Sequence, residues 1–298
     1  MSLRRSLFAA LSAASLLSVA ATAAVAGPWS LAPGEYYTEL RGGFHSASSY
    51  YNDDGDRVLT NTLSESRSLR SYTELGWKKS LSVQMTLPAV SRTFRNSNTG
   101  ATQSNAGLGD FGFGLRWALQ NGASATAVQF AWQAPAGYNR EITPALGDGN
   151  QKLSAALAIG RPAGKNAFWQ ASAGYLYDFR SAGARSKDLA ADGDAAIDWA
   201  DHFTADATVG VWMGNLLVAG QWLGEFPSQT GRATETTWML AGPRLTYRVD
   251  DRIDAFAGSW HTPTGKNVMH VDEFYAGVTW KATKLNRLQG FLGSAKRP

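Results

Sequence analysis

The chain has 298 residues, no cysteine and a formal net charge of only +4. The lack of cysteine excludes disulfides, a thiol nucleophile and a cysteine-ligated metal, and the small, scattered charge argues against nucleic acid as a partner. A glycine count of 31 and an aromatic content of 11% favour β-strands with close backbone contacts.

The N-terminus has the organisation of a secretory signal peptide. Arg4 and Arg5 precede an apolar stretch of small residues that ends in Ala24-Val25-Ala26, which is a charged start, an apolar centre and a cleavage signature. A membrane-anchoring helix is the alternative, because about 20 apolar residues can span a bilayer. Since alanine and serine dominate the stretch, we expect residues 1–26 to be cleaved on export.

Twelve segments then alternate between apolar and polar residues, with turn residues between them. Side chains of a strand point to opposite faces in turn, so each segment predicts a strand with one apolar and one polar face. The segments are Glu35–Ala47, Leu69–Lys78, Leu81–Leu87, Gly107–Leu119, Val128–Trp132, Leu153–Ile159, Phe168–Arg180, His202–Met213, Leu216–Phe226, Trp238–Arg248, Arg252–His261 and Val271–Lys281. His202–Met213 and Arg252–His261 are the least regular, and Asp192–Asp201 is another place where a strand would fit.

The connections between these segments alternate in length. Most are short turns at one end of the strands, whereas Ser48–Thr62 and Ser181–Asp201 are long polar loops at the other. An outer-membrane barrel has short periplasmic turns, long outer loops and an even strand number. We therefore predict an all-β fold, a transmembrane up-and-down antiparallel β-barrel of about 12 strands over residues 27–281. Residues 282–298 would form a periplasmic extension, frayed or as a short helix. A secreted all-β sandwich is the alternative.

Aromatic residues fall at two levels in this arrangement, as the two interfacial girdles of a membrane barrel require. The periplasmic level would contain Tyr36, Trp77, Trp117, Trp169, Trp212, Tyr247 and Trp280. The outer level would contain Phe94, Trp132, Tyr177, Phe179, Trp222, Trp238, Trp260 and Phe274.

The segment GLGDFGFGLRWAL at 107–119 has the clearest alternation in the chain. Phe111, Phe113 and Trp117 share one face, and Asp110 and Arg116 lie on the other. Its first six residues match the dinucleotide motif G-x-G-x-x-G, but that motif requires a helix to follow. The alternation instead continues, so a nucleotide site is excluded.

This segment also carries a family resemblance. Gly107-Leu108-Gly109-Asp110-Phe111-Gly112-Phe113-Gly114 is similar to a strand motif of the outer-membrane transporter family linked to the meta-cleavage pathway of phenol degradation. The resemblance implies an outer-membrane barrel that takes up hydrophobic or aromatic compounds. The chain departs from that pattern at its C-terminus, because residues follow the last predicted strand.

Charged residues on the polar faces are the main functional signal. The predicted pore-lining residues are Glu39, Arg41, Arg70, Glu74, Asp110, Arg116, Asp178, Arg180, Asp206, Glu225, Arg244 and Arg248. Opposed acids and bases in a wet lumen favour polar solutes, whereas paired charges can also fill a narrow barrel. The leading hypothesis is a passive outer-membrane channel for small molecules, without cofactor or metal. Its expected partners are outer-membrane lipid, the solute, periplasmic chaperones and the barrel-assembly machinery. A closed structural or surface-binding barrel is the rival.

An outer-membrane lipid hydrolase is a minor alternative. Ser259 and His261 are two residues apart and would face lipid near the outer rim, but a serine nucleophile also needs a third group that orients its base. The sequence indicates no such group. It also gives no histidine cluster with metal-ligand spacing, and the most natural interpretation of His261 and His270 is a solvated pair at a rim loop.

Overall fold

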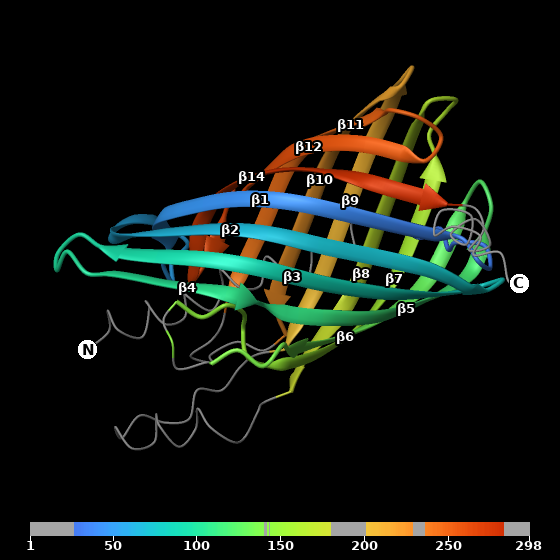
Figure 1. Cartoon of the computed structure of the whole chain (residues 1–298). Coiled ribbons are helices and arrows are strands. Elements are labelled where there is room, and N and C mark those ends of the chain that lie inside the picture. The colour runs from blue at the N-terminus through green and yellow to red at the C-terminus, as the bar shows by residue number, and fades with distance from the viewer. Residues whose placement is uncertain (1–26, 140–141, 143, 180–200, 229–235, 283–298) are drawn as a thin grey trace, which may run out of the picture.

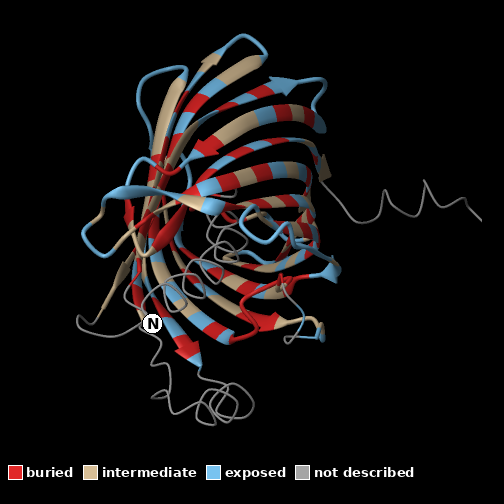
Figure 2. Cartoon of the chain, turned by 90° about the vertical axis from the view of Figure 1, so that its left-hand side faces the viewer, coloured by how far each residue is buried: buried red, intermediate tan, exposed pale blue. Residues whose placement is uncertain are grey.

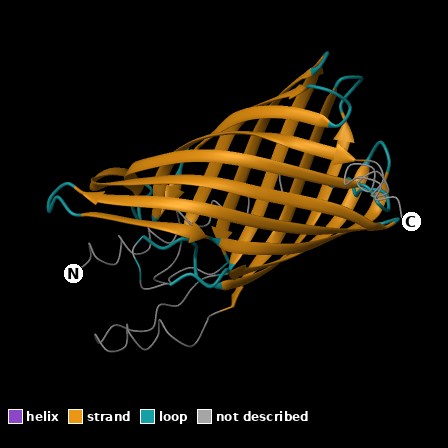
Figure 3. Cartoon of the chain, in the orientation of Figure 1, coloured by secondary structure: helices purple, strands orange, loops and turns teal. Residues whose placement is uncertain are grey.

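The computed structural model describes residues 27–139, 142, 144–179, 201–228 and 236–282. The predicted signal peptide, Arg180, most of the Ser181–Asp201 loop and the extension after Ala282 lie outside these residues. The described part consists of strands and connecting loops (Figures 1 and 3). No helix in it has the length and apolar character to cross a membrane.

The strands form one antiparallel sheet that closes on itself. They are β1 (Tyr36–Tyr51), β2 (Arg57–Lys78), β3 (Leu81–Asn96), β4 (Thr102–Leu108), β5 (Asp110–Asn121), β6 (Ala125–Pro135), β7 (Gln151–Pro162), β8 (Ala167–Phe179), β9 (His202–Met213), β10 (Leu216–Pro227), β11 (Thr237–Arg248), β12 (Ile253–His261), β13 (Gly265–Lys266) and β14 (Val268–Ala282). Apart from the short β4 and β13, neighbours in sequence pair with each other, and β1 pairs with β14 to complete the ring. The predicted up-and-down barrel is confirmed.

The wall has twelve strand positions, because β4 and β5 both pair with β3 and β13 is only two residues long. The predicted strand 107–119 is therefore interrupted. It breaks at Gly109, whose N–H donates to the carbonyl of Pro88 (2.9 Å). A Cβ on Gly109 would lie 3.1 Å from the carbonyl oxygen of Leu146, so the glycine permits a close approach by a loop inside the barrel.

The prediction of a long loop at Ser48–Thr62 is wrong. β1 continues to Tyr51 and β2 starts at Arg57, so that only residues 52–56 connect them. The register between β1 and both of its neighbours shifts around Ala47 to Ser49. The inward parity of β1 continues through this irregularity, because Ala47, Ser49 and Tyr51 are buried, but the outward-facing Ser46 and Ser48 are polar. The apolar–polar alternation that a period-two search detects therefore ends here.

Buried and exposed residues alternate along the strands (Figure 2). The outer face exposes large apolar side chains, among them Trp77, Phe113, Trp117, Phe203 and Phe274. Soluble monomers rarely expose a continuous apolar surface of this extent, and a lipid-facing band requires one. The outer face is therefore the lipid-facing face.

Three aromatic residues predicted for the outer girdle lie inside the barrel instead. Phe94, Trp238 and Trp260 are buried, and the last two belong to an apolar cluster with Leu240, Phe256 and others at the loop end. We predicted the girdle position of these residues from their depth along the strand alone. Whether a residue faces lipid or the lumen depends instead on its place in the alternation of the strand. Trp238 shares its face with the buried Arg244.

Candidate functional site: the barrel lumen

The predicted charged residues gather on the inner face of the barrel. Ten of the twelve are buried: Glu39, Arg41, Arg70, Glu74, Asp110, Arg116, Asp178, Asp206, Glu225 and Arg244. Arg248 is exposed at the short-turn end, with its guanidinium 4.4 Å from the ring centre of Trp212. Arg180 lies outside the described residues.

Three ion pairs link inward-facing residues of different strands. They lie near the short-turn end and in the middle of the barrel. Arg116 Nη1 donates to both carboxylate oxygens of Glu74, at 2.8 and 2.6 Å, across the intervening β3. Arg244 Nη2 donates to Glu39 (3.0 Å), and Arg41 Nη2 to Glu273 (3.4 Å). Buried charges are costly unless they are matched, and here these arginines have carboxylate or aromatic neighbours, including the ring of Tyr275 beside Arg41.

The chain before β1 covers part of the short-turn end from inside. Residues 27–35 contact inward-facing positions of β2, β3, β5, β7 and β8. Arg116 donates to the carbonyl of Trp29 (3.2 Å), Asn121 donates to that of Ser30 (2.8 Å), and the Leu31 N–H donates to Ser82 Oγ (3.3 Å). Pro28 is fully buried. We call residues 27–35 the N-terminal segment.

The described residues of the loop between β6 and β7, which are 136–139, 142 and 144–150, cover the lumen from the opposite end, and we call this loop the inner loop. The carboxylate of Asp110 accepts hydrogen bonds from Tyr138 OH (2.5 Å), the Asp148 N–H (2.7 Å) and Gln133 Nε2 (2.9 Å). Arg92 Nη1 donates to the Ala145 carbonyl (2.6 Å). Residues 146–150 of this loop are buried, so the loop folds into the barrel.

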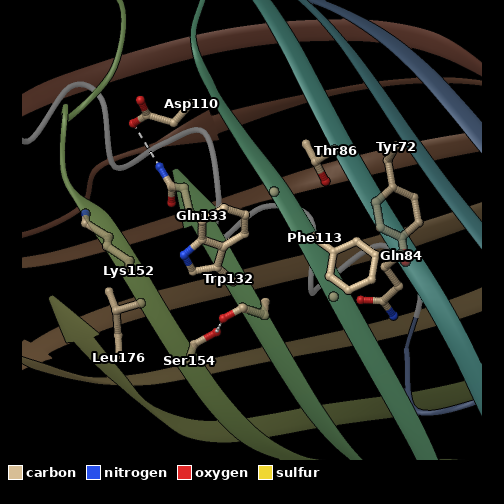
Figure 4. Close-up of a pocket in the computed structure, with 13 residues that line it drawn as sticks. Tyr72, Gln84, Thr86, Asp110, Phe113, Trp132, Gln133, Lys152, Ser154 and Leu176 are labelled. Carbon is tan, nitrogen blue, oxygen red and sulfur yellow. Dashed lines mark hydrogen bonds between the residues drawn. The ribbon is translucent and has the colours of Figure 1, made fainter. Parts of the chain in front are cut away.

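Asp110 and its neighbours also line a small cavity (Figure 4). Tyr72 and Leu176 supply apolar surface, while Gln84, Gln133 and Lys152 supply polar groups. The inward-facing Gly112 and Gly114 leave the wall bare at this level. The cavity therefore combines an apolar side with charged and amide groups.

Several residues of these arrangements were missed by the sequence analysis. Glu273, Lys152 and Arg92 are buried on inward-facing positions. The alternation along β14, β7 and β3 would have predicted that each of them faces the lumen. Lys152 forms an ion pair with Asp148 and interacts electrostatically with Asp178 and Glu225. Asp148 itself lies in a loop, where no periodicity indicates a face.

The structure provides only part of the catalytic triad that the hydrolase alternative requires. His261 Nδ1 lies 2.5 Å from Asp272 Oδ1, which would be the missing orienting group. However, Ser259 pairs across the sheet with the exposed Phe274, and no hydrogen bond between Ser259 and His261 is present in the described structure. A nucleophile and its base need such contact.

Solved structures with a similar fold include an outer membrane channel and two porins. The COG4313 outer membrane channel from Pseudomonas putida F1 superposes with a TM-score of 0.68 at 12% identity, covering 87% of this chain and all of the channel. The NanC porin gives 0.52 at 11% identity over 82% of this chain and all of the porin. The KdgM porin gives 0.50 at 6% identity over 83% of this chain and 99% of the porin.

These likenesses show that the fold is that of outer-membrane channels and porins. No protein-family model matches the sequence. No curated protein matches it either.

Proposed function

We propose that this protein is a passive outer-membrane channel for small molecules, with a lumen that the N-terminal segment and the inner loop narrow from its two ends. The observation that carries the proposal is the distribution of residues over the barrel wall. Large apolar side chains are exposed on its outer face, and charged side chains are buried on its inner face. A lumen filled only for stability would gain little from charged residues, because apolar packing of similar volume is often as stabilising as a buried ion pair or more so. The similar fold of an outer membrane channel supports the same function.

The cavity beside Asp110 supports a finer proposal about the solute. Tyr72, Leu176 and the two wall glycines offer apolar contacts to a passing solute, and Gln84, Gln133 and Lys152 offer polar ones. We therefore propose small organic molecules with an apolar and a polar part as the preferred solutes. The aromatic compounds implied by the family resemblance belong to this class.

Liposome swelling tests both levels of the proposal. Vesicles that contain the purified protein should swell in isotonic glucose faster than protein-free vesicles, and faster still in isotonic phenylalanine. Equal swelling by both solutes would contradict the solute class alone. If neither solute causes swelling, even after removal of residues 28–33 and loosening of the inner loop by Asp110→Ala, the barrel is structural and not a channel.

A further inference from the structure

We propose that His261, His270 and Asp272 form a binding site for a divalent transition-metal ion, with Zn²⁺ the best candidate, on the outer face of the barrel at its loop end. The three residues lie where β12 ends and β14 begins, and Asp272 faces outward whereas its neighbour Glu273 faces the lumen. The site is independent of the channel function proposed above.

The three side chains already lie close to coordinating distance. His261 Nδ1 is 2.5 Å from Asp272 Oδ1, His270 Nδ1 is 3.9 Å from Asp272 Oδ2, and one ligand atom from each residue lies within 4.8 Å of the others. Tetrahedral zinc with bonds of about 2.0–2.1 Å separates its ligand atoms by roughly 3.3 Å. The observed distances lie on both sides of that value, so small side-chain rotations suffice.

The backbone that carries these side chains is held firmly. His261 and Asp272 are direct partners in the β12–β14 register, and His270 is two residues from Asp272 on the same face of β14. Between them, the Thr262 hydroxyl accepts from the Val271 N–H (3.1 Å) and donates to the Val271 carbonyl (3.3 Å). A preorganised site binds more tightly because less ordering is needed on binding.

Aromatic neighbours also position the buried imidazole. The ring of His270 neighbours those of Tyr51 (6.0 Å between centres) and His261 (4.8 Å). The Tyr51 hydroxyl in turn donates to the Thr262 carbonyl (3.0 Å). The anchored Tyr51 ring therefore helps to position His270 beside the other two ligands.

The ligand set and its exposure suit a transition metal. Two imidazoles and one carboxylate prefer Zn²⁺, Cu²⁺, Ni²⁺ or Fe²⁺ over Ca²⁺ or Mg²⁺, which favour oxygen. The side chains of His261 and Asp272 are half exposed, at 54% and 51%, whereas that of His270 is buried. An ion can therefore enter from outside, and a water molecule would complete a tetrahedral site with three protein ligands.

One cation nearby opposes metal binding. The Arg57 side chain donates to Ser49 Oγ (2.9 Å) and interacts electrostatically with His270. Replacing it should raise metal affinity, because a positive charge beside the site repels the ion. A simple His261–Asp272 ion pair without metal gives no reason for such a gain.

Calorimetric titration with ZnCl₂ tests the site, using detergent-purified protein without a polyhistidine tag and stripped with chelator. We expect one Zn²⁺ per chain, at least about tenfold weaker binding for His270→Ala and Asp272→Asn, and tighter binding for Arg57→Gln. Asp250→Asn, an exposed acid on a turn at the opposite end, is the matched control and should leave affinity unchanged.

Barrel formation in each variant is checked by the heat-dependent shift of its electrophoretic mobility. If His270→Ala does not fold, Arg57→Gln and the exposed His261→Ala still test the proposal in opposite directions. Wild-type affinity equal to that of His261→Ala would overturn it. So would Arg57→Gln binding no tighter than wild type.

Discussion

The two ends of the lumen are narrowed in different ways. At the short-turn end, the N-terminal segment is held by contacts that are distributed over five strands, with Arg116 supplying one of them. At the loop end, the inner loop depends strongly on one carboxylate, since Asp110 accepts hydrogen bonds from its Tyr138 hydroxyl and its Asp148 N–H. A single substitution should therefore release the inner loop, whereas the N-terminal segment should stay in place after the loss of any one of its contacts.

Both anchors belong to the same strand. Asp110 begins β5 and Arg116 lies six residues later on the same inward face. The alternating segment that stands out in the sequence thus connects the two restrictions of the lumen. The glycines between the two charges, Gly112 and Gly114, leave the cavity open beside them.

The largest expected effect is on stability, from Arg116→Ala. Glu74 would keep its burial but lose its cation, and an uncompensated buried charge costs about 3–5 kcal/mol. The free energy of unfolding, measured with urea in detergent, should fall by this amount, whereas Arg248→Ala, an exposed arginine of the same end, should change it by less than about 0.5 kcal/mol. Equal losses in both variants would show that the ion pair contributes nothing special.

Asp110→Ala should release the inner loop. The substitution removes the acceptor of three hydrogen bonds, and bonds to a charged group contribute roughly 1.5–3 kcal/mol each, partly offset by the desolvation that the variant avoids. We expect about 3 kcal/mol of lost stability and faster cleavage within 136–150 during limited proteolysis. Unchanged cleavage would mean that Arg92 and Lys152 hold the loop without Asp110.

A pair of glycine substitutions, one at each end of the lumen, distinguishes disruption of the inner loop from disruption of the N-terminal segment. A Cβ on Gly147 would collide with the Asp110 carboxylate, and one on Gly76 with the carbonyl of Ala32 in the N-terminal segment. Each collision should cost roughly 1–3 kcal/mol. Only Gly147→Ala should accelerate proteolysis of the inner loop. Gly220→Ala is the control, since a methyl group at that position would have no neighbouring atom within 4 Å.

The smallest effect is expected from Tyr138→Phe. This variant removes one of the three hydrogen bonds to Asp110 (2.5 Å) and keeps the ring. The loss should be about 1 kcal/mol, with a slight increase in loop proteolysis. A loss as large as that of Asp110→Ala would show that Tyr138, rather than the carboxylate, is the main anchor.

Much of the barrel wall could be predicted because alternation reports the face of each strand directly. The bounds of β9 agree with the predicted His202–Met213, and the inward placement of Asp110 and Arg116 follows from parity alone. The same reasoning failed where the outward face becomes polar and where parity was ignored. The outward-facing Ser46 and Ser48 concealed the outer part of β1, and Trp238 was placed by its depth along the strand without regard to its face.

The restrictions of the lumen could not be predicted from the sequence. Residues 27–35 and 136–150 have no period, because each is held by tertiary hydrogen bonds rather than by a sheet register. The local sequence Gly27-Pro28-Trp29 does not indicate that Pro28 is buried inside the barrel. Pairing across the lumen, as between Arg244 and Glu39, also joins positions far apart in the chain.

Single-channel conductance in planar lipid bilayers tests the central claim most directly. We expect wild-type protein to conduct in small, discrete steps and Asp110→Ala to conduct in larger ones, because the inner loop no longer narrows the lumen. The absence of conductance in both proteins, each with a correctly folded barrel, would contradict the channel. Equal step sizes in the two would contradict the role given to Asp110.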